Sequence, residues 1–263
     1  MNIQLKTVEA IQFRKKLDSG RTSPCIFNCE DVITNQKEEY VVKLKHSLDR
    51  RDRGLICEVV SSVIAKSIGL NTPAIALVNI ETQMASIIDA IPQGIINSSI
   101  GLNFGSKLLV GGYLNLPNDY PLVNHLEQAA TEIIVFDALI QNPDRRIGKP
   151  NMFVKGDKFY VFDHELAFSF LELIGEIHNP WEQAAFSSCV RGHFFYRQLK
   201  GRALNLEKIS QGIKCINNDS LNDIQSIIPN EWKDDKMDQI FDHLNSIVRN
   251  ADSFIEGIRR ELV

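Results

Sequence analysis

The first ninety residues alternate short apolar runs with polar turns. Residues 25–27 and 40–45 are rich in β-branched and aromatic side chains, and a polar segment at 30–39 separates them. We expect these two runs to pair as a hairpin. Further strands are predicted at 77–80 and 85–91, before a turn-forming Pro-Gln-Gly sequence.

Helical spacing is clearest between residues 55 and 68, where apolar side chains recur as one broad stripe. Gly69 ends this helix. Residues 122–140 show the same spacing and predict a core helix. A strand-rich segment follows at 151–168, and the chain beyond it, including 237–263, is mostly helical in pattern.

These elements predict an α+β protein with two lobes. A small β-rich lobe with one helix is expected at residues 1–92, and a mainly α-helical lobe at 93–263. The length of 263 residues allows one large core or two modest ones. A composition of 44% hydrophobic and 24% charged residues is that of an ordinary globular protein.

Charge and cysteine usage exclude several classes of protein. A net charge of −4 argues against a broad basic surface for nucleic acid. No stretch approaches the ~18 apolar residues of a membrane span, and the first residues lack the apolar core of a signal peptide, so we expect a cytoplasmic protein without a membrane segment. The five cysteines are scattered and form no zinc pattern, which indicates free thiols.

Three polar residues around the predicted 151–168 strands suggest phosphate chemistry. Phosphoryl transfer needs a carboxylate near the acceptor hydroxyl and oxygen ligands that hold Mg²⁺. Asp144 is the candidate catalytic carboxylate, and Asn151 and Asp163 are candidate metal ligands. Such residues are also common in turns for local reasons. Asp163 directly follows a predicted buried strand, however, where an unpaired carboxylate is costly without a cation.

The segment from Phe136 to Arg145, together with Asn151 and the sequence Phe162-Asp163-His164-Glu165, resembles the HipA-like kinase family. That family is similar to the phosphatidylinositol kinases and, more remotely, to protein kinases, so the resemblance implies a two-lobed, protein-kinase-like fold. The resemblance covers most of residues 18–170. It implies binding of ATP and Mg²⁺ and transfer of the γ-phosphate to a hydroxyl, with a protein serine or threonine as the first expectation.

The N-terminal half extends the resemblance. The sequence Tyr40-Val41-Val42-Lys43 is similar to the family's nucleotide-lysine strand, and Glu58 looks like the helix glutamate that pairs with this lysine. Lys45 is the rival, because strand alternation puts it on the same face as Lys43. Glu58 also lies off the main apolar stripe of its helix, beside small residues that allow close packing. Without the resemblance, a solvated lysine and a solvated glutamate explain the same pattern.

A polar turn before the first hairpin strand resembles the family's phosphate-facing loop. Thr22 and Ser23 could donate hydrogen bonds to a phosphate, and Gly20 could let the backbone approach it. Turns of this composition are common for other reasons.

Two residues depart from the family pattern. Lys149 lies five positions after Asp144, where many kinase-like loops have asparagine, and Glu165 stands where a glycine usually follows the Asp-His pair. These departures favour the alternative function, a nucleotide-binding pseudokinase that acts as a regulatory interaction module. Arg145 is expected to pair with a carboxylate and His164 to be structural.

Overall fold

Five strands close into a barrel in the N-terminal part of the protein. The computed structural model describes residues 5–18, 22–173 and 178–263. The barrel strands are β1 (Lys6–Lys16), β2 (Cys25–Asp31), β3 (Lys37–Lys43), β4 (Ile75–Ile80) and β5 (Gly101–Lys107). Their order is β1-β2-β3-β5-β4, and a parallel β1–β4 pair closes the barrel. The predicted hairpin is confirmed, with Ile26 opposite Val41 in an antiparallel pair.

A long helix, α1 (Asp52–Ser67), follows β3 after the short 3₁₀ helix η1 (Lys45–Ser47). Two further helices, α2 (Thr82–Ser86) and α3 (Gln93–Asn97), lie between β4 and β5. The expectations of one helix in this region and of a strand at 85–91 are therefore wrong. Helix α2 ends at Ser86, and the buried Ile88 and Ile91 lie in the irregular segment before α3, which a short apolar run does not distinguish from a strand.

Strand β5 lies beyond the lobe boundary expected near residue 92, yet it pairs with both β3 and β4. Because its removal would open the barrel, β5 belongs with the N-terminal strands. We propose that the boundary between the lobes lies after Lys107.

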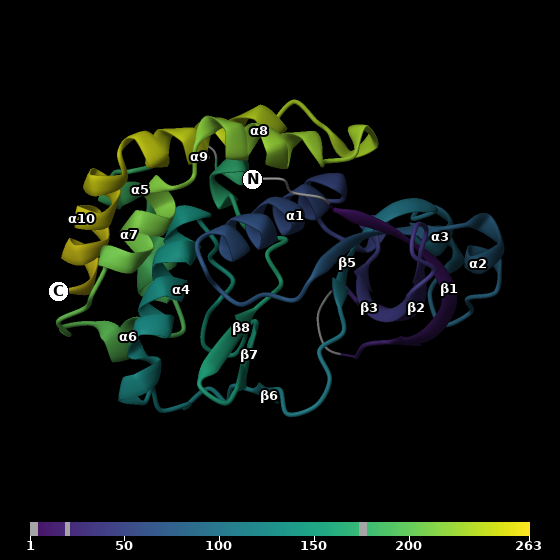
Figure 1. The fold of residues 1–263 in the computed structure, drawn as a ribbon, viewed down its shortest axis with the longest axis horizontal. Helices are drawn as coiled ribbons and strands as arrows, with labels where there is room; N and C mark the ends of the chain where they lie inside the picture. The colour runs from purple at the N-terminus through teal and green to yellow at the C-terminus, as the bar shows by residue number, and fades with distance from the viewer. Residues whose placement is uncertain (1–4, 19–21, 174–177) are drawn as a thin grey trace.

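The remaining chain is mainly helical. A three-stranded sheet of order β6-β7-β8 is formed by β6 (Leu114–Asn115), β7 (Met152–Lys155) and β8 (Lys158–Val161). The helices are α4 (Glu127–Leu139), α5 (Gln183–Gly192), α6 (Tyr196–Leu199), α7 (Glu207–Lys214), α8 (Asn218–Ser226), α9 (Met237–Arg249) and α10 (Ala251–Leu262). Short 3₁₀ turns are η2 (Asn124–Leu126), η3 (Ser169–Glu172) and η4 (Asn230–Trp232). Figure 1 shows the barrel at one end of the molecule, most of these helices at the other, and α1 between them.

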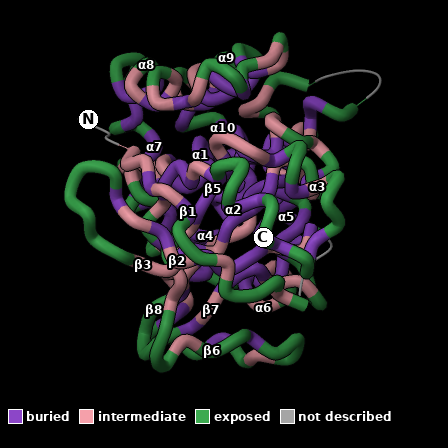
Figure 2. Tube along the Cα trace, turned by 90° about the vertical axis from the view of Figure 1, so that its right-hand side faces the viewer, coloured by how far each residue is buried: buried purple, intermediate pink, exposed green. Residues whose placement is uncertain are grey.

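Two hydrophobic cores meet at β4. Alternate residues of β4 face opposite sides, so Val78 joins the barrel interior while Leu77 packs into the larger core. That larger core includes α1 together with the C-terminal helices. Figure 2 shows the buried trace concentrated in the interior and the exposed trace in the outer loops. Helix α1 therefore ties the barrel to the helical part.

In residues 5–18, 22–173 and 178–263, no helix is both long and apolar enough to cross a bilayer.

A prediction follows from the tight interior of the barrel. A Cβ atom at Gly105 would lie 2.5 Å from Cγ2 of Val78, so Gly105→Ala should overpack the barrel and lower the free energy of unfolding by about 1–3 kcal/mol. Denaturant unfolding measures the loss. Gly192→Ala is the control, because nothing lies within 4 Å of the added atom. If Gly105→Ala were as stable as that control, the described barrel packing would be wrong.

Candidate active site

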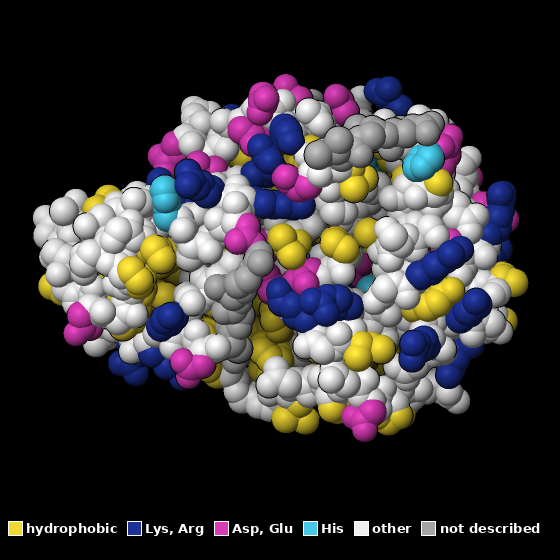
Figure 3. Space-filling view, turned by 180° about the vertical axis from the view of Figure 1, so that it is seen from behind, with side chains coloured by type: hydrophobic (Ala, Val, Ile, Leu, Met, Phe, Trp, Pro, Cys, Tyr) yellow, Lys and Arg dark blue, Asp and Glu magenta, His cyan; other side chains and the backbone are white. Residues whose placement is uncertain are grey.

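A cavity of about 1170 Å³ opens between the barrel and the β7–β8 hairpin. Its lining comes from β1, β2, β3, β5, α1 and the segment that leads into β7. Apolar side chains such as Ile26, Val41 and Phe104 lie beside the charged residues Lys43, Glu58 and Asp163 in this lining. In the space-filling view, hydrophobic, acidic and basic side chains surround a hollow near the middle of the face (Figure 3). The cavity thus combines an apolar wall with a charged end.

Lys43 is the last residue of β3, and its ammonium group is buried among carboxylates. Its Nζ lies 2.5 Å from Oε1 of Glu58 and 3.0 Å from Oε2 of Glu165, and it also contacts Oδ1 of Asp163. Burial lowers the pKa of Lys43, but the carboxylates, Asp163 first, raise it well above its ordinary value. The ammonium group therefore stays charged at neutral pH.

Glu58 projects from α1 and is almost fully buried. Besides the ammonium group of Lys43, its Oε1 accepts a hydrogen bond of 2.9 Å from the backbone N–H of His164. Burial raises the pKa of Glu58 to about 7, against the opposing effect of Lys43. The structure thus brings the predicted lysine and glutamate together.

Asp163 and Asn151 flank the two hairpin strands, and both line the cavity. Each has a left-handed backbone, with φ of 62° for Asp163 and 46° for Asn151. Residues other than glycine rarely adopt this conformation, and strained positions of this kind concentrate at functional sites. Burial raises the pKa of Asp163, but Lys43 and Lys149 hold it well below its ordinary range. Asp163 is therefore a carboxylate held between two ammonium groups.

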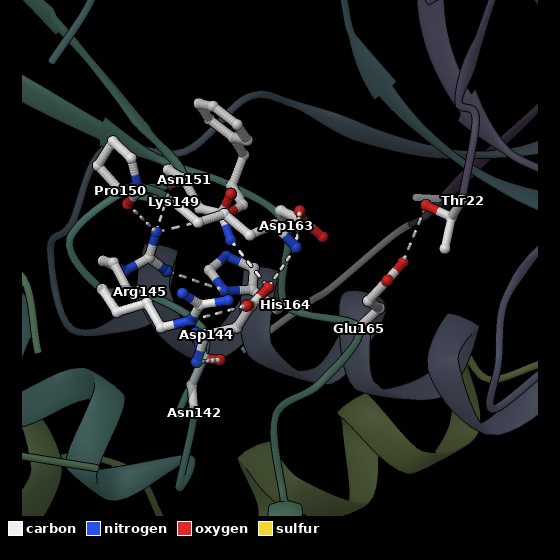
Figure 4. Close-up of polar contacts among 12 residues, drawn as sticks. Thr22, Asn142, Asp144, Arg145, Lys149, Pro150, Asn151, Asp163, His164 and Glu165 are labelled. Atoms are coloured by element: carbon white, nitrogen blue, oxygen red, sulfur yellow. Dashed lines mark hydrogen bonds and ion pairs between the residues drawn. The ribbon is translucent and has the colours of Figure 1, made fainter. Parts of the chain in front are cut away.

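Asp144 lies in the loop between α4 and β7 and is nearly buried. Its backbone N–H donates to Oδ1 of Asn142 over 3.1 Å, and its Oδ2 accepts from Nδ2 of Asn151 over 3.2 Å. The same Oδ2 contacts Nζ of Lys149, which is also 3.5 Å from Oδ2 of Asp163 (Figure 4). The three predicted residues Asp144, Asn151 and Asp163 thus converge around one lysine.

The buried side chain of Arg145 holds the loop that carries Asp144 in place. The expected carboxylate partner is confirmed as Asp137 of α4, with Nε of Arg145 2.5 Å from its Oδ2. The guanidinium also donates to the backbone carbonyls of Pro150, Asn151 and Phe162. Figure 4 shows Arg145 beside Pro150 and Asn151. One buried cation therefore joins the Asp144 loop to both hairpin strands.

Asp137 and His193 were missed by the sequence reasoning. Nε2 of His193 lies 3.0 Å from Oδ2 of Asp137. Burial alone would raise the pKa of Asp137, but Arg145 and His193 lower it to about 2. An acidic residue inside an apolar helix was the available signal, because a buried carboxylate requires a partner.

The predicted phosphate loop is only partly brought to the cavity. Thr22 lines it and lies 3.5 Å from Oε2 of Glu165, whereas Ser23 does not line it. Ser23 has a left-handed backbone, with φ of 48°, and its carbonyl accepts from the thiol of Cys25. Gly20 lies outside the described residues.

Lys45 and His164 occupy structural positions. Lys45 lies past the end of β3 in η1, and its backbone N–H donates to Oδ1 of Asn103 over 3.0 Å. His164 is fully buried, with Nδ1 3.3 Å from Nη2 of Arg145. Burial and then Arg145 lower the pKa of His164 to about 3, so the ring is neutral.

A buried lysine paired with a helix carboxylate, beside a loop carboxylate and a strand-end aspartate, is the arrangement of kinase-type nucleotide sites. The chain belongs to the HipA-like kinase family, whose profile matches residues 10–260. Membership supports a kinase-type function. No protein with a curated description matches the sequence.

Solved structures of kinases and pseudokinases are similar to this chain at low sequence identity. The Helicobacter pylori proinflammatory kinase CtkA is 13% identical, with a TM-score of 0.49, over 98% of this chain and 99% of its own. The Neurospora crassa PAN3 pseudokinase is 9% identical, with a TM-score of 0.35, over 99% of this chain and 68% of its own.

The buried Arg145–Asp137 pair predicts a loss of stability when its anion is removed. Asp137→Asn should lower the free energy of unfolding by about 3–5 kcal/mol, because it leaves the guanidinium buried without a countercharge. Denaturant unfolding measures the loss, with Asp157→Asn in an exposed turn as the control. Equal stability of the two variants would show that the pair does not support the loop.

A pH dependence is expected from His243 of α9. Its Nε2 donates to the backbone carbonyl of Leu139 at the end of α4, and burial lowers its pKa to about 4. Since the unfolded chain takes up this proton near pH 6.5, His243 should destabilise the fold as pH falls from about 6.5 to 4.

His243→Gln should remove about 3 kcal/mol of the stability lost between pH 7 and 4, because glutamine does not titrate. Denaturant unfolding of both proteins between pH 7 and 4 measures this difference in the free energy of unfolding. His125→Gln, at an exposed position, should keep the dependence of the unmodified protein. Identical pH profiles for the unmodified protein and His243→Gln would contradict the assignment.

Proposed function

We propose that this protein is an ATP- and Mg²⁺-dependent kinase that transfers the γ-phosphate to a hydroxyl group, with a protein serine or threonine as acceptor. The observation that carries the proposal is the meeting of Lys43, Glu58 and Asp163 at the charged end of the cavity. The acceptor class is proposed by analogy with the HipA-like kinase family. The other residues then take roles in binding the nucleotide, holding the metal or orienting the acceptor.

The nucleotide base is proposed to occupy the apolar wall of the cavity. Val41 and Lys43 share one face of β3, so a base against Val41 leaves its phosphates near the ammonium group. Ile26 and Phe104 contribute further apolar surface. Lys107, Leu108 and Leu109 also line the cavity.

The residues near Asp163 fit a magnesium ion. Mg²⁺ prefers hard oxygen ligands and commonly takes one or two protein carboxylates. Asp163 and Asn151 supply a carboxylate and an amide oxygen at the same end of the cavity. Bound there with ATP, Mg²⁺ would neutralise charge on the β- and γ-phosphates.

Asp144 is proposed to orient the acceptor hydroxyl and to take its proton. The acceptor oxygen forms a bond to the γ-phosphorus as the bond to the β–γ bridging oxygen breaks, and ADP leaves. Lys43 remains positioned for the phosphates by Glu58. The hydrogen bond that the backbone N–H of Asp144 donates to Asn142, and the one that its carboxylate accepts from Asn151, keep Asp144 oriented during this step.

A nucleotide-binding pseudokinase that acts as an interaction module is the second candidate. The carboxylate of Glu165 lies 3.0 Å from Nζ of Lys43, so it competes with phosphate for the ammonium group. Lys149 pairs with the proposed catalytic carboxylate of Asp144. Both contacts favour a site that does not transfer phosphate.

Phosphate transfer and nucleotide binding together distinguish the two candidates. Purified protein is incubated with radiolabelled ATP and Mg²⁺, with and without cell lysate. Asp144→Asn should keep ATP binding but reduce transfer roughly 100- to 10,000-fold, because the acceptor loses its base. Asp163→Ala should abolish the Mg²⁺ dependence of ATP binding in calorimetry, because the metal loses its carboxylate.

The matched lysine variants test the nucleotide assignment. Lys43→Met should weaken ATP binding, whereas Lys45→Met should leave it unchanged, because Lys45 lies beyond the strand end. Metal-dependent ATP binding without transfer to any acceptor would favour the pseudokinase. Absence of ATP binding would overturn both candidates.

A further inference from the structure

Lys149 joins two carboxylates that come from different segments of the chain. Its Nζ contacts Oδ2 of Asp144 in the loop and lies 3.5 Å from Oδ2 of Asp163 at the end of β8. The side chain of Lys149 is 31% exposed, but those of Asp144 and Asp163 are only 7% and 20% exposed. An ion pair with largely buried acceptors is screened less than one on the open surface.

The backbone holds Lys149 in this position. Arg146 and Lys149 exchange hydrogen bonds of 3.1 and 2.9 Å, which close a tight turn. Gly148 within that turn has a φ of 87°, a conformation that favours glycine. The following residue, Pro150, is anchored through its carbonyl by Arg145. Lys149 is therefore presented by a closed turn rather than by an open loop.

We propose that the ammonium group of Lys149 is a built-in cation that takes the place of one of the two metal ions of kinase-type sites. The protein then binds its nucleotide with a single divalent ion. This inference rests on the proposed function, because it concerns the same nucleotide site. Protein kinases hold two Mg²⁺ ions through a strand-end aspartate and a loop asparagine.

The charges around Asp163 support one metal rather than two. Its Oδ1 contacts Lys43 and its Oδ2 faces Lys149. When the ammonium group of Lys43 binds a phosphate instead, Oδ1 of Asp163 becomes available to a metal ion. Oδ2 of Asp163 still faces the ammonium group of Lys149. A second divalent ion between Asp144 and Asp163 would lie against that positive charge and be repelled.

The protonation state of Lys149 agrees with this role. A lysine side chain is an ammonium ion at neutral pH, and this one lies against two carboxylates. It therefore supplies a positive charge beside Asp144 without requiring a bound ion.

Counting bound Mn²⁺ tests the inference without a measurement of activity. Mn²⁺ is titrated into the protein with a non-hydrolysable ATP analogue, and free Mn²⁺ is followed by electron paramagnetic resonance. The unmodified protein should bind one Mn²⁺ per nucleotide complex. Lys149→Asn should bind two, because the positive charge is replaced by an amide oxygen that can act as a ligand.

Two variants serve as controls. Lys149→Arg keeps the positive charge and should retain one Mn²⁺. Lys158→Asn removes a lysine from an exposed hairpin position and should also retain one. Calorimetry of the analogue with each variant verifies that nucleotide is bound.

The outcomes separate this inference from the proposed function. Two Mn²⁺ in the unmodified protein, or one in Lys149→Asn with nucleotide bound, would overturn the built-in cation alone. Failure of the unmodified protein to bind the analogue would overturn the proposed function and this inference with it. One Mn²⁺ that becomes two only in Lys149→Asn would support the inference.

Discussion

The buried ammonium group of Lys43 is the constraint on which the rest of the site depends. A charged amine can be removed from water only where anions compensate it, and here the anions come from α1 and from the segment after β8. Because these partners lie in different parts of the chain, the barrel, α1 and the hairpin must assemble together for Lys43 to be buried. The larger core, which α1 shares with the C-terminal helices, supplies the packing for this assembly.

A second buried cation, Arg145, organises the part of the cavity near Asp144. It is compensated by Asp137 of α4 and fastens the Asp144 loop to the hairpin strands through backbone carbonyls. His164 connects the two centres, since its backbone N–H donates to Glu58 while its ring contacts Arg145. One neutral histidine therefore connects the Lys43 and Arg145 clusters.

The two departures from the family pattern have opposite charges and lie at the same site. Glu165 adds an anion near Lys43, and Lys149 adds a cation between Asp144 and Asp163. The family pattern has glycine at the position of Glu165 and asparagine at that of Lys149, both uncharged. The negative and positive charges of Glu165 and Lys149 cancel, so the total charge of the site is the same but its distribution differs. Glu165 is also among the groups that raise the pKa of Lys149, so the two substitutions stabilise one another electrostatically.

The sequence by itself determined the elements with strong local signals and the order of the polar residues. Helical spacing located α1, and the resemblance paired Lys43 with Glu58 and brought Asp144, Asn151 and Asp163 to one site. Only the tertiary structure decided that 85–91 is not a strand and that β5 completes the barrel, because a short apolar run does not specify its partner. The tertiary structure also decided the pairing of Asp137 with His193, which are 56 positions apart in the chain. An acidic residue in an apolar helix indicates that a buried charge needs compensation, but only the folded chain shows which residue compensates it.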